Sequence, residues 1–266
     1  MDFAKRRRLS RFFDRVSGRG IILPMDHGLT LGPIKGIERT GQMGSVLRNP
    51  EINGVVLHKG TLVRLMERGA LDHVGVLLHV NGMSSMAAAP DTKELIADVG
   101  TAAAFGAEGI SLQINFDGTN DAHNLRVLGA VADAAFKHGM PLLTMLYDKV
   151  PSEDIAVRIR RLNHLVRIAI ELGTDLLKLS LPATEFELRA VLENAASDVH
   201  IFFAGGALIE EKRLFHHFET AMALGAKGVC VGRNIFERDE PGVFLRRLRR
   251  SIDVSMSGEA MRGSMS

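Results

Sequence analysis

The chain has 266 residues and a nearly balanced charge, with 33 Lys and Arg against 31 Asp and Glu. This balance argues against a dedicated nucleic-acid binder, and no apolar run is long enough to cross a membrane. The single cysteine, Cys230, excludes an internal disulfide, and the basic N-terminus lacks the apolar core of a signal peptide. We therefore expect a cytoplasmic protein that binds neither nucleic acid nor membranes.

Short apolar runs alternate with longer helical patterns along most of the chain, and near-continuous apolar runs are typical of strands covered by helices on the outside. Eight repeats of strand and helix in this length predict a single-domain α/β fold, a (β/α)₈ TIM barrel over 1–252 with a basic N-terminal helix. An open doubly wound sheet is the alternative, but no GxGxxG motif follows the first run. Residues 253–266 have little periodicity, which predicts a flexible tail. The eight runs are 20–26, 54–58, 74–80, 109–115, 142–147, 176–181, 201–206 and 228–232.

Capping residues and glycines mark the expected helices. Asp91 and Ser152 are candidate N-terminal residues for helices over 91–107 and 152–173, and Gly139 is a candidate C-terminal glycine for a helix over 121–139. Two basic clusters, at 5–11 and 246–250, fit solvated helix faces, with ion pairing at a subunit contact as the alternative.

One lysine interrupts the sixth run, "TDLLKLSLP". If Leu177 and Leu179 face the helices, alternation points Lys178 into the barrel; otherwise it is a strand-end lysine that reaches solvent. Burial disfavours the charged form, so an inward lysine is expected to have a lowered pKa and to be a better nucleophile.

Asp26 and Tyr147 stand at the ends of the first and fifth runs, and active sites of this fold lie at the C-terminal ends of the strands. Together with Lys178 they form a set suited to Schiff-base chemistry, in which the amine attacks a ketone and the other two groups move protons. The imine then replaces a Lewis acid, so we expect no metal and no cofactor. His27, His58 and His79 also stand at strand ends, but without the local pairing that would favour a zinc site.

A phosphate site is expected after the last two runs, where barrels commonly bind one through backbone N–H groups. The candidates are Gly205, Gly206, Gly232 and Arg233, because Arg233 can add charge-assisted bonds. We include His27 and Lys149 as further substrate-binding candidates at strand ends.

The motifs "IILPMDHG", "GVVLHKG", "AGG" and "GVCVGRNIF", with a lysine in the sixth run, resemble the archaeal-type class I aldolases. That group contains class I fructose-bisphosphate aldolases and 2-amino-3,7-dideoxy-D-threo-hept-6-ulosonate (ADH) synthases, and "LHKG" and "HVNGMSS" are more similar to the synthases. The resemblance implies that Lys178 forms the Schiff base, Asp26 assists proton transfer and Tyr147 is the general acid or base. It also implies a homo-oligomer, with a decamer as one expected size.

Some positions depart from the family pattern. Pro-Arg-Gly usually follows the tyrosine, whereas Asp148 and Lys149 follow Tyr147 here; Gly-Gly-Pro-Lys is replaced by "GGALIEEK". Lys149 can stand in for the missing arginine, and Lys212 in part for the missing lysine.

Three hypotheses follow. The first is a lysine-dependent aldolase or transaldolase of the ADH synthase type, which acts on a phosphorylated keto-sugar and an aldehyde such as aspartate semialdehyde. The second is a class I fructose-bisphosphate aldolase, and the third is a non-catalytic binding or scaffolding barrel.

Overall fold

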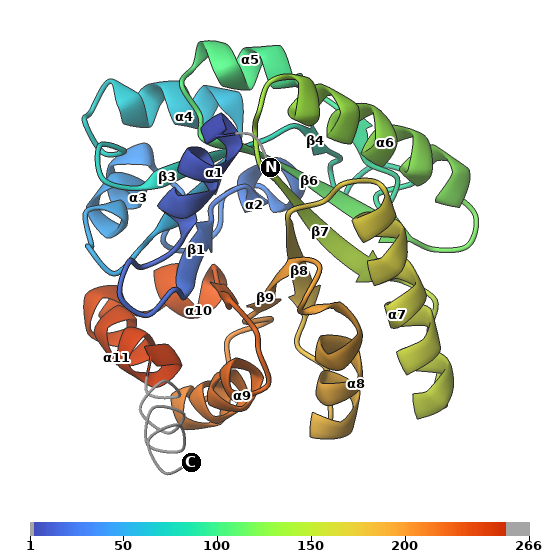
Figure 1. Cartoon of the computed structure of the whole chain (residues 1–266). Coiled ribbons are helices and arrows are strands. Elements are labelled where there is room, and N and C mark those ends of the chain that lie inside the picture. Colours follow the sequence, from blue (N-terminus) through green and yellow to red (C-terminus); the bar gives the residue numbers. More distant parts are fainter. Residues whose placement is uncertain (1–2, 254–266) are drawn as a thin grey trace.

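Parallel strands close into a barrel in this computed structural model, which describes residues 3–253 (Figure 1). The strand order around the barrel is β1-β10-β9-β8-β7-β6-β3-β2. The predicted single-domain TIM barrel is therefore confirmed, and each of the eight predicted runs holds one strand. The strands are β1 (Gly20–Pro24), β2 (Gly54–Leu57), β3 (Gly75–His79), β6 (Gly109–Phe116), β7 (Leu142–Asp148), β8 (Leu176–Ser180), β9 (His200–Ala204) and β10 (Gly228–Cys230).

The helices surround the barrel and cover its outer face (Figure 1). Alternate side chains of each strand contribute to a large outer core under these helices and to a smaller cluster inside the barrel. The helices of the described chain are α1 (Phe3–Leu9), α2 (His27–Leu31), α3 (Thr40–Leu47), α4 (Lys59–Met66), α5 (Val99–Ala104), α6 (Asp121–Lys137), α7 (Ile155–Glu171), α8 (Glu185–Ala195), α9 (Glu211–Ala223), α10 (Arg233–Phe236) and α11 (Pro241–Asp253).

Phe12 closes the N-terminal end of the barrel from below. It lies in the short 3₁₀ turn Ser10–Phe12 and is fully buried. Gly54 and Gly75 leave the space for its ring, because a Cβ at these positions would lie 2.7 Å and 2.8 Å from Phe12 ring carbons. Active sites of barrels lie at the opposite end, so this plug leaves the C-terminal mouth free for chemistry.

The two basic clusters are held by contacts within the chain. Lys5 of α1 pairs with Asp175 at 2.8 Å, and Arg8 donates to the carbonyls of His138 and Gly139, so α1 packs below β7 and β8. In α11, Arg249 is part-buried and donates to the Asn53 side chain at 2.6 Å. The expectation that the basic clusters lie on fully solvated helix faces is therefore wrong for these residues, because they attach the terminal helices to the barrel.

The segment after β3 contains a small antiparallel hairpin that the sequence analysis missed. It consists of β4 (Asn81–Gly82) and β5 (Glu94–Leu95), paired Asn81 with Leu95 and Gly82 with Glu94. The helix predicted over 91–107 is accordingly shorter and begins only at Val99, with Asp98 as N-cap accepting from the Thr101 N–H at 2.6 Å. The N-cap prediction for Asp91 is wrong, because the chain is still in the hairpin there.

Other helix ends follow the predicted pattern. Gly139 has φ +57° just beyond α6, a conformation that glycine adopts without strain. α7 begins later than predicted, with Asp154 instead of Ser152 as its N-cap. Apart from Asp253, the last residue of α11, the predicted tail 253–266 lies outside the described residues. Within 3–253, no helix has the length and apolar character needed to cross a membrane.

Candidate active site

Lys178 points into the barrel. It lies in the middle of β8, beside Met145 of β7 and Phe202 of β9, and is only 6% exposed. Its neighbours Leu177 and Leu179 belong to the outer core, as the alternation predicts. Lys178 is therefore a buried lysine, and the alternative of a solvated strand end is wrong.

The Lys178 amine has polarisable and ionisable neighbours inside the barrel. Nζ lies 3.6 Å from Met145 Sδ. Burial by itself lowers the pKa of Lys178, but Tyr147, Cys230 and Asp26 raise it, and the net result lies above the usual range of lysine. The expectation of a lowered pKa is therefore wrong, because these partners outweigh burial and favour the ammonium form.

Cys230 is the second inward-facing group near Lys178. It is buried in the inner cluster, as its apolar surroundings in the sequence indicate. Burial raises the pKa of the Cys230 thiol to about 11, against a lowering by Lys178 and a further rise from Asp26. The thiol is therefore protonated at neutral pH, and its charge favours the Lys178 ammonium only at high pH.

Asp26 lies two residues beyond the end of β1, among histidines. Its Oδ2 is 3.6 Å from His79 Nε2, and its Oδ1 is 3.7 Å from His27 Nδ1. Burial raises the pKa of Asp26, but His79, His27, Lys178 and His58 lower it further, so the net shift is downward. The carboxylate is therefore ionised, and it balances the charge of the Lys178 ammonium.

His79 was noted at a strand end but not selected as a site residue. It ends β3, is 3% exposed, and its Nδ1 lies 3.0 Å from Ser111 Oγ. The His58 ring packs edge-on against it, with ring centroids 5.1 Å apart. Burial lowers the pKa of His79 to about 3 despite the opposing effect of Asp26. His79 is thus a neutral imidazole held in place beside the carboxylate.

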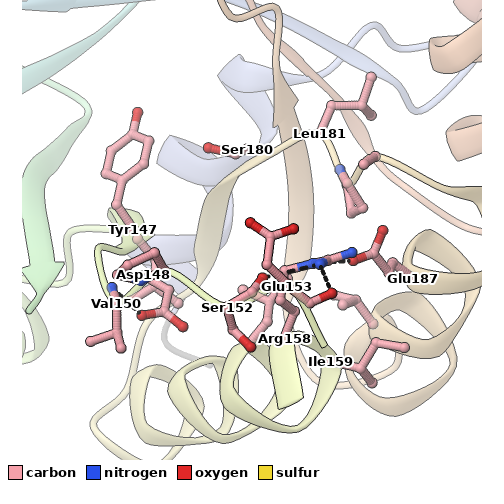
Figure 2. Close-up of a pocket in the computed structure, with 16 residues that line it drawn as sticks. Tyr147, Asp148, Val150, Ser152, Glu153, Arg158, Ile159, Ser180, Leu181 and Glu187 are labelled. Atoms are coloured by element: carbon pink, nitrogen blue, oxygen red, sulfur yellow. Dashed lines mark hydrogen bonds and ion pairs between the residues drawn. The ribbon is translucent and has the colours of Figure 1, made fainter. Parts of the chain in front are cut away.

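Tyr147 lies near the end of β7 with its ring against the inner cluster. A cavity of about 450 Å³ opens beside it, between the first turns of α7 and α8. In Figure 2 the Tyr147 ring points away from the Arg158–Glu187 ion pair in that cavity. The cavity shares Tyr147 and Ser180 with the barrel mouth but is not lined by Lys178 or Asp26, so we place the reacting atoms in the barrel and not in this side cavity.

The loops after β9 and β10 lie next to each other at the mouth of the barrel. Gly232 lies against His27, and a Cβ there would be 2.9 Å from His27 Cε1. Gly232 is also the N-cap of α10, whose first residue is Arg233. Gly206 has φ +68° in the loop after β9. Gly232 of the predicted phosphate site is therefore a neighbour of His27, which follows Asp26 in the chain.

Asn234 fixes the relative position of these two loops and was missed from the sequence. Its side chain is fully buried; Nδ2 donates to Gly205 O at 3.0 Å and Ala207 O at 2.7 Å, and Oδ1 accepts from Ile209 N–H at 3.1 Å. The sequence analysis quoted this position only as part of the motif "GVCVGRNIF". The motif alone does not predict that the Asn234 amide joins two loops.

Lys149 and Lys212 were expected to replace an arginine and a lysine of the family pattern, but neither is a free cation facing the barrel mouth. Lys149 Nζ lies 3.1 Å from Asp91 Oδ1 and 5.9 Å from the Tyr147 ring centroid, so it is near the site but its charge is already paired. Lys212 faces a groove between α9 and α11 together with Arg247. Its neighbour Arg213 instead lines a cavity with Gly205 and Gly206. The suggestion that Lys212 partly replaces the family lysine is therefore wrong, because the helix turns it away.

No cluster of three or more His, Cys, Asp or Glu side chains is arranged for metal binding among residues 3–253. What the mouth of the barrel does contain is a buried lysine, an ionised carboxylate, a phenol and a glycine-rich loop pair. A TIM barrel with this set is an aldolase-type barrel.

The family model for DeoC/LacD family aldolases matches residues 20–238. The chain is 33% identical to 2-amino-3,7-dideoxy-D-threo-hept-6-ulosonate synthase 1 of Archaeoglobus fulgidus, covering 96% of this chain and 93% of that protein. It is 30% identical to 2-amino-4,5-dihydroxy-6-oxo-7-(phosphonooxy)heptanoate synthase of Streptomyces griseus, covering 98% and 94%. The crystal structure of an archaeal fructose 1,6-bisphosphate aldolase superposes with a TM-score of 0.81 at 24% identity, covering 94% of this chain and 99% of that one. The chain belongs to the DeoC/LacD aldolase family.

Proposed function

We propose that the protein is a lysine Schiff-base aldolase or transaldolase that makes or breaks a carbon–carbon bond of a phosphorylated keto-sugar. The observation that carries this proposal is Lys178, a lysine buried inside the barrel beside Asp26 and Tyr147. A buried lysine with ionisable neighbours is rare without a chemical role.

Lys178 is the nucleophile in this mechanism. The ammonium first gives up a proton, and the Nζ lone pair then adds to the ketone carbon to form a carbinolamine. Protonation of the carbinolamine hydroxyl lets the former carbonyl oxygen leave as water, so the ammonium and the ketone become an iminium and one water. Removal of a proton from the adjacent carbon gives an enamine, which attacks the aldehyde carbon and forms the new bond.

Tyr147 transfers the protons, and Asp26 stabilises the positive charge. The Tyr147 phenol can donate to a leaving hydroxyl and accept from an attacking one, a role that requires a group within reach of the lysine. The ionised Asp26 stabilises the cationic iminium by charge, and it lies beside His79 and His27. The neutral state of His79 keeps a second positive charge away from the iminium.

The phosphate of the donor is assigned to Gly205, Gly206, Gly232 and Arg233. Arg233 is the first residue of α10, and Gly206 has open space where a side chain would lie, so phosphate oxygens can approach the backbone there. His27 packs against Gly232 on this side of the mouth and is the further substrate-binding candidate there.

An aldehyde such as aspartate semialdehyde is the proposed acceptor. Both curated relatives described above carry names of seven-carbon amino-keto acid synthases, which supports joining a ketone donor to an amino-acid-derived aldehyde. Cleavage of a fructose bisphosphate is the alternative. The Lys149–Asp91 ion pair favours condensation with an aldehyde over cleavage of a fructose bisphosphate. Lys149 stands at the family's arginine position, and its charge is already neutralised by Asp91.

A cytoplasmic location and a homo-oligomer, with a decamer as one expected size, complete the proposal. Exposed aromatic side chains support the oligomer: Phe136 on α6 is 78% exposed and Phe186 on α8 is 68% exposed. Sedimentation velocity on the purified chain tests it, and a monomer at micromolar concentration would contradict it.

A condensation assay tests the reaction. Dihydroxyacetone phosphate is incubated with aspartate semialdehyde, and product formation is followed by mass spectrometry; fructose 1,6-bisphosphate cleavage is measured in parallel. The Lys178→Met variant is expected to remain folded and lose turnover with either substrate, whereas Lys137→Met on the exposed face of α6 keeps it. Turnover by Lys178→Met would exclude the imine mechanism, and no turnover by the wild type would favour the non-catalytic barrel.

A further inference from the structure

Lys93 is a buried lysine that the mechanism above does not use. It directly precedes β5 in the hairpin that follows β3, and it is 5% exposed. The segment is tied down at several points: Asn115 Nδ2 donates to Asp91 O at 2.9 Å, and His123 Nε2 lies 2.9 Å from Lys93 O. The position of Lys93 over the barrel mouth is therefore fixed by the backbone around it.

The Lys93 ammonium has no hydrogen bond or ion pair within the described part of the chain. The nearby acid Asp91 is already paired with Lys149 at 3.1 Å. Burial lowers the pKa of Lys93, Asp91 and Asp26 raise it in part, and Lys149 lowers it further, so the net shift is downward. A buried cation that lacks an anion is costly, and an anionic ligand would remove that cost.

The barrel order places this cation across the mouth from the phosphate loops. β3, which leads into the hairpin, is separated from β9 by three strands in either direction around the closed barrel. β9 leads into the Gly205–Gly206 loop. Lys178 and Asp26 belong to strands between these two, and Lys93 acts electrostatically on both Asp26 and His79. A substrate with its phosphate on the glycine loops therefore has its far end near Lys93.

We propose that Lys93 binds a carboxylate on the second substrate and so selects an aldehyde that carries one. This assignment rests on the proposed aldolase function and identifies the group that recognises the acceptor aldehyde. Lys93, Lys149 and Asp91 together carry one net positive charge, which matches a carboxylate better than a phosphate dianion. The single unpaired ammonium is also a compact point charge, as suits a small acceptor.

Matched acceptors and matched variants test the assignment. The donor is dihydroxyacetone phosphate, and the acceptors are succinic semialdehyde, which carries a carboxylate, butanal, its neutral analogue of equal chain length, and glyceraldehyde 3-phosphate. Condensation is measured with the wild type, Lys93→Met, Lys93→Arg and the control Lys35→Met, an exposed lysine paired with Asp239. Borohydride trapping of the donor is measured on every variant, since that step does not involve the acceptor.

The wild type and Lys35→Met are expected to prefer succinic semialdehyde over butanal in kcat/KM. Lys93→Met should lose about 10–100-fold in kcat/KM for succinic semialdehyde, the range of one charge-assisted hydrogen bond, with little change for butanal. Donor trapping should stay at the wild-type level, and Lys93→Arg should restore part of the preference.

Three results would overturn the assignment. One is an equal loss for succinic semialdehyde and butanal in Lys93→Met, which would indicate a merely structural role. Another is a stronger preference for glyceraldehyde 3-phosphate that Lys93→Met abolishes, which would make Lys93 a phosphate-binding residue. The third is failure of donor trapping in the wild type, which would remove the Schiff-base proposal itself and the acceptor assignment with it.

Discussion

Asp26 and His79 lie with Oδ2 and Nε2 3.6 Å apart at the ends of β1 and β3, and the carboxylate is ionised while the imidazole is neutral. The pair therefore places one fixed negative charge, on Asp26, beside the neutral imidazole of His79 at the mouth of the barrel. The charge then acts on Lys178 and on the iminium that we propose it forms.

This pair predicts an acid-sensitive fold. The pKa of His79 is lowered to about 3 by burial, so between pH 6.5 and pH 3 the unfolded chain binds a proton at His79 that the native chain does not. Stability is therefore fully present above pH 6.5 and is lost as the pH falls, by about 1.4 kcal/mol per pH unit from this residue. Asp26, with its lowered pKa, acts in the same direction below pH 4.

Urea unfolding at several pH values checks this prediction. His79→Gln cannot titrate, so its free energy of unfolding should decline less steeply between pH 6 and pH 4 than that of the wild type. Exposed His216→Gln on α9 serves as the control and should follow the wild type. Equal slopes for His79→Gln and the wild type would show that His79 titrates normally in the native state.

Tyr147→Phe is expected to slow turnover without disturbing the fold. The ring packs against the inner cluster and Phe keeps that packing, but the proton donor is gone, so kcat should fall about 10²–10⁴-fold. Steady-state kinetics over pH 6 to 9 and a thermal melt measure both effects. A kcat within a few-fold of the wild type would assign proton transfer to another group.

Asn234→Ala should impair binding of the phosphorylated donor. Removing the amide leaves the carbonyls of Gly205 and Ala207 without their buried donor, and the loop after β9 loses its tie to α10. We expect KM for the donor to rise about tenfold and stability to fall by about 1–3 kcal/mol. Asn194→Ala on the exposed side of α8 is the matched control, since its side chain bonds only the Ala190 carbonyl of its own helix.

A donor KM unchanged in Asn234→Ala would separate the loop from phosphate binding. Arg233→Ala adds the direct test of the same site. It should raise KM for a phosphorylated donor more than it changes kcat, because the phosphate is bound similarly in the ground and transition states. An unchanged KM in Arg233→Ala would remove this residue from the phosphate site.

Gly54→Ala should destabilise the barrel from its lower end. The added methyl would lie 2.7 Å from Phe12 Cδ1 and 3.4 Å from Ile22 Cγ1, so we expect a loss of about 1–3 kcal/mol. Gly129→Ala in α6 meets no atom within 4 Å and should gain up to about 1 kcal/mol from helix propensity. Urea unfolding of both variants measures the difference, and equal stability would show that Phe12 moves freely.

The sequence predicted the barrel well because its strands are signalled by apolar runs and its helix ends by glycines. The inward direction of Lys178 followed from alternation with Leu177 and Leu179. The upward shift of its pKa did not, because it depends on Tyr147, Cys230 and Asp26, which come from three other strands.

Local patterns were misleading where the chain departs from the strand–helix repeat. The hairpin at 81–95 has strands of two residues, too short to show a period, and "DTKEL" resembles a helix start. Lys93 therefore fell within the helix predicted over 91–107 and was not considered for the site. Asn234 and His79 were likewise missed as site residues, since their roles depend on partners far away in the sequence.

The most direct test of the central claim is to trap the imine. The wild-type protein is incubated with dihydroxyacetone phosphate, reduced with borohydride, digested and mapped by peptide mass. The account predicts a reduced donor adduct on the peptide that contains Lys178 and no adduct in Lys178→Met. An adduct on Lys93 or on any other lysine, or none with any keto-phosphate, would contradict the account.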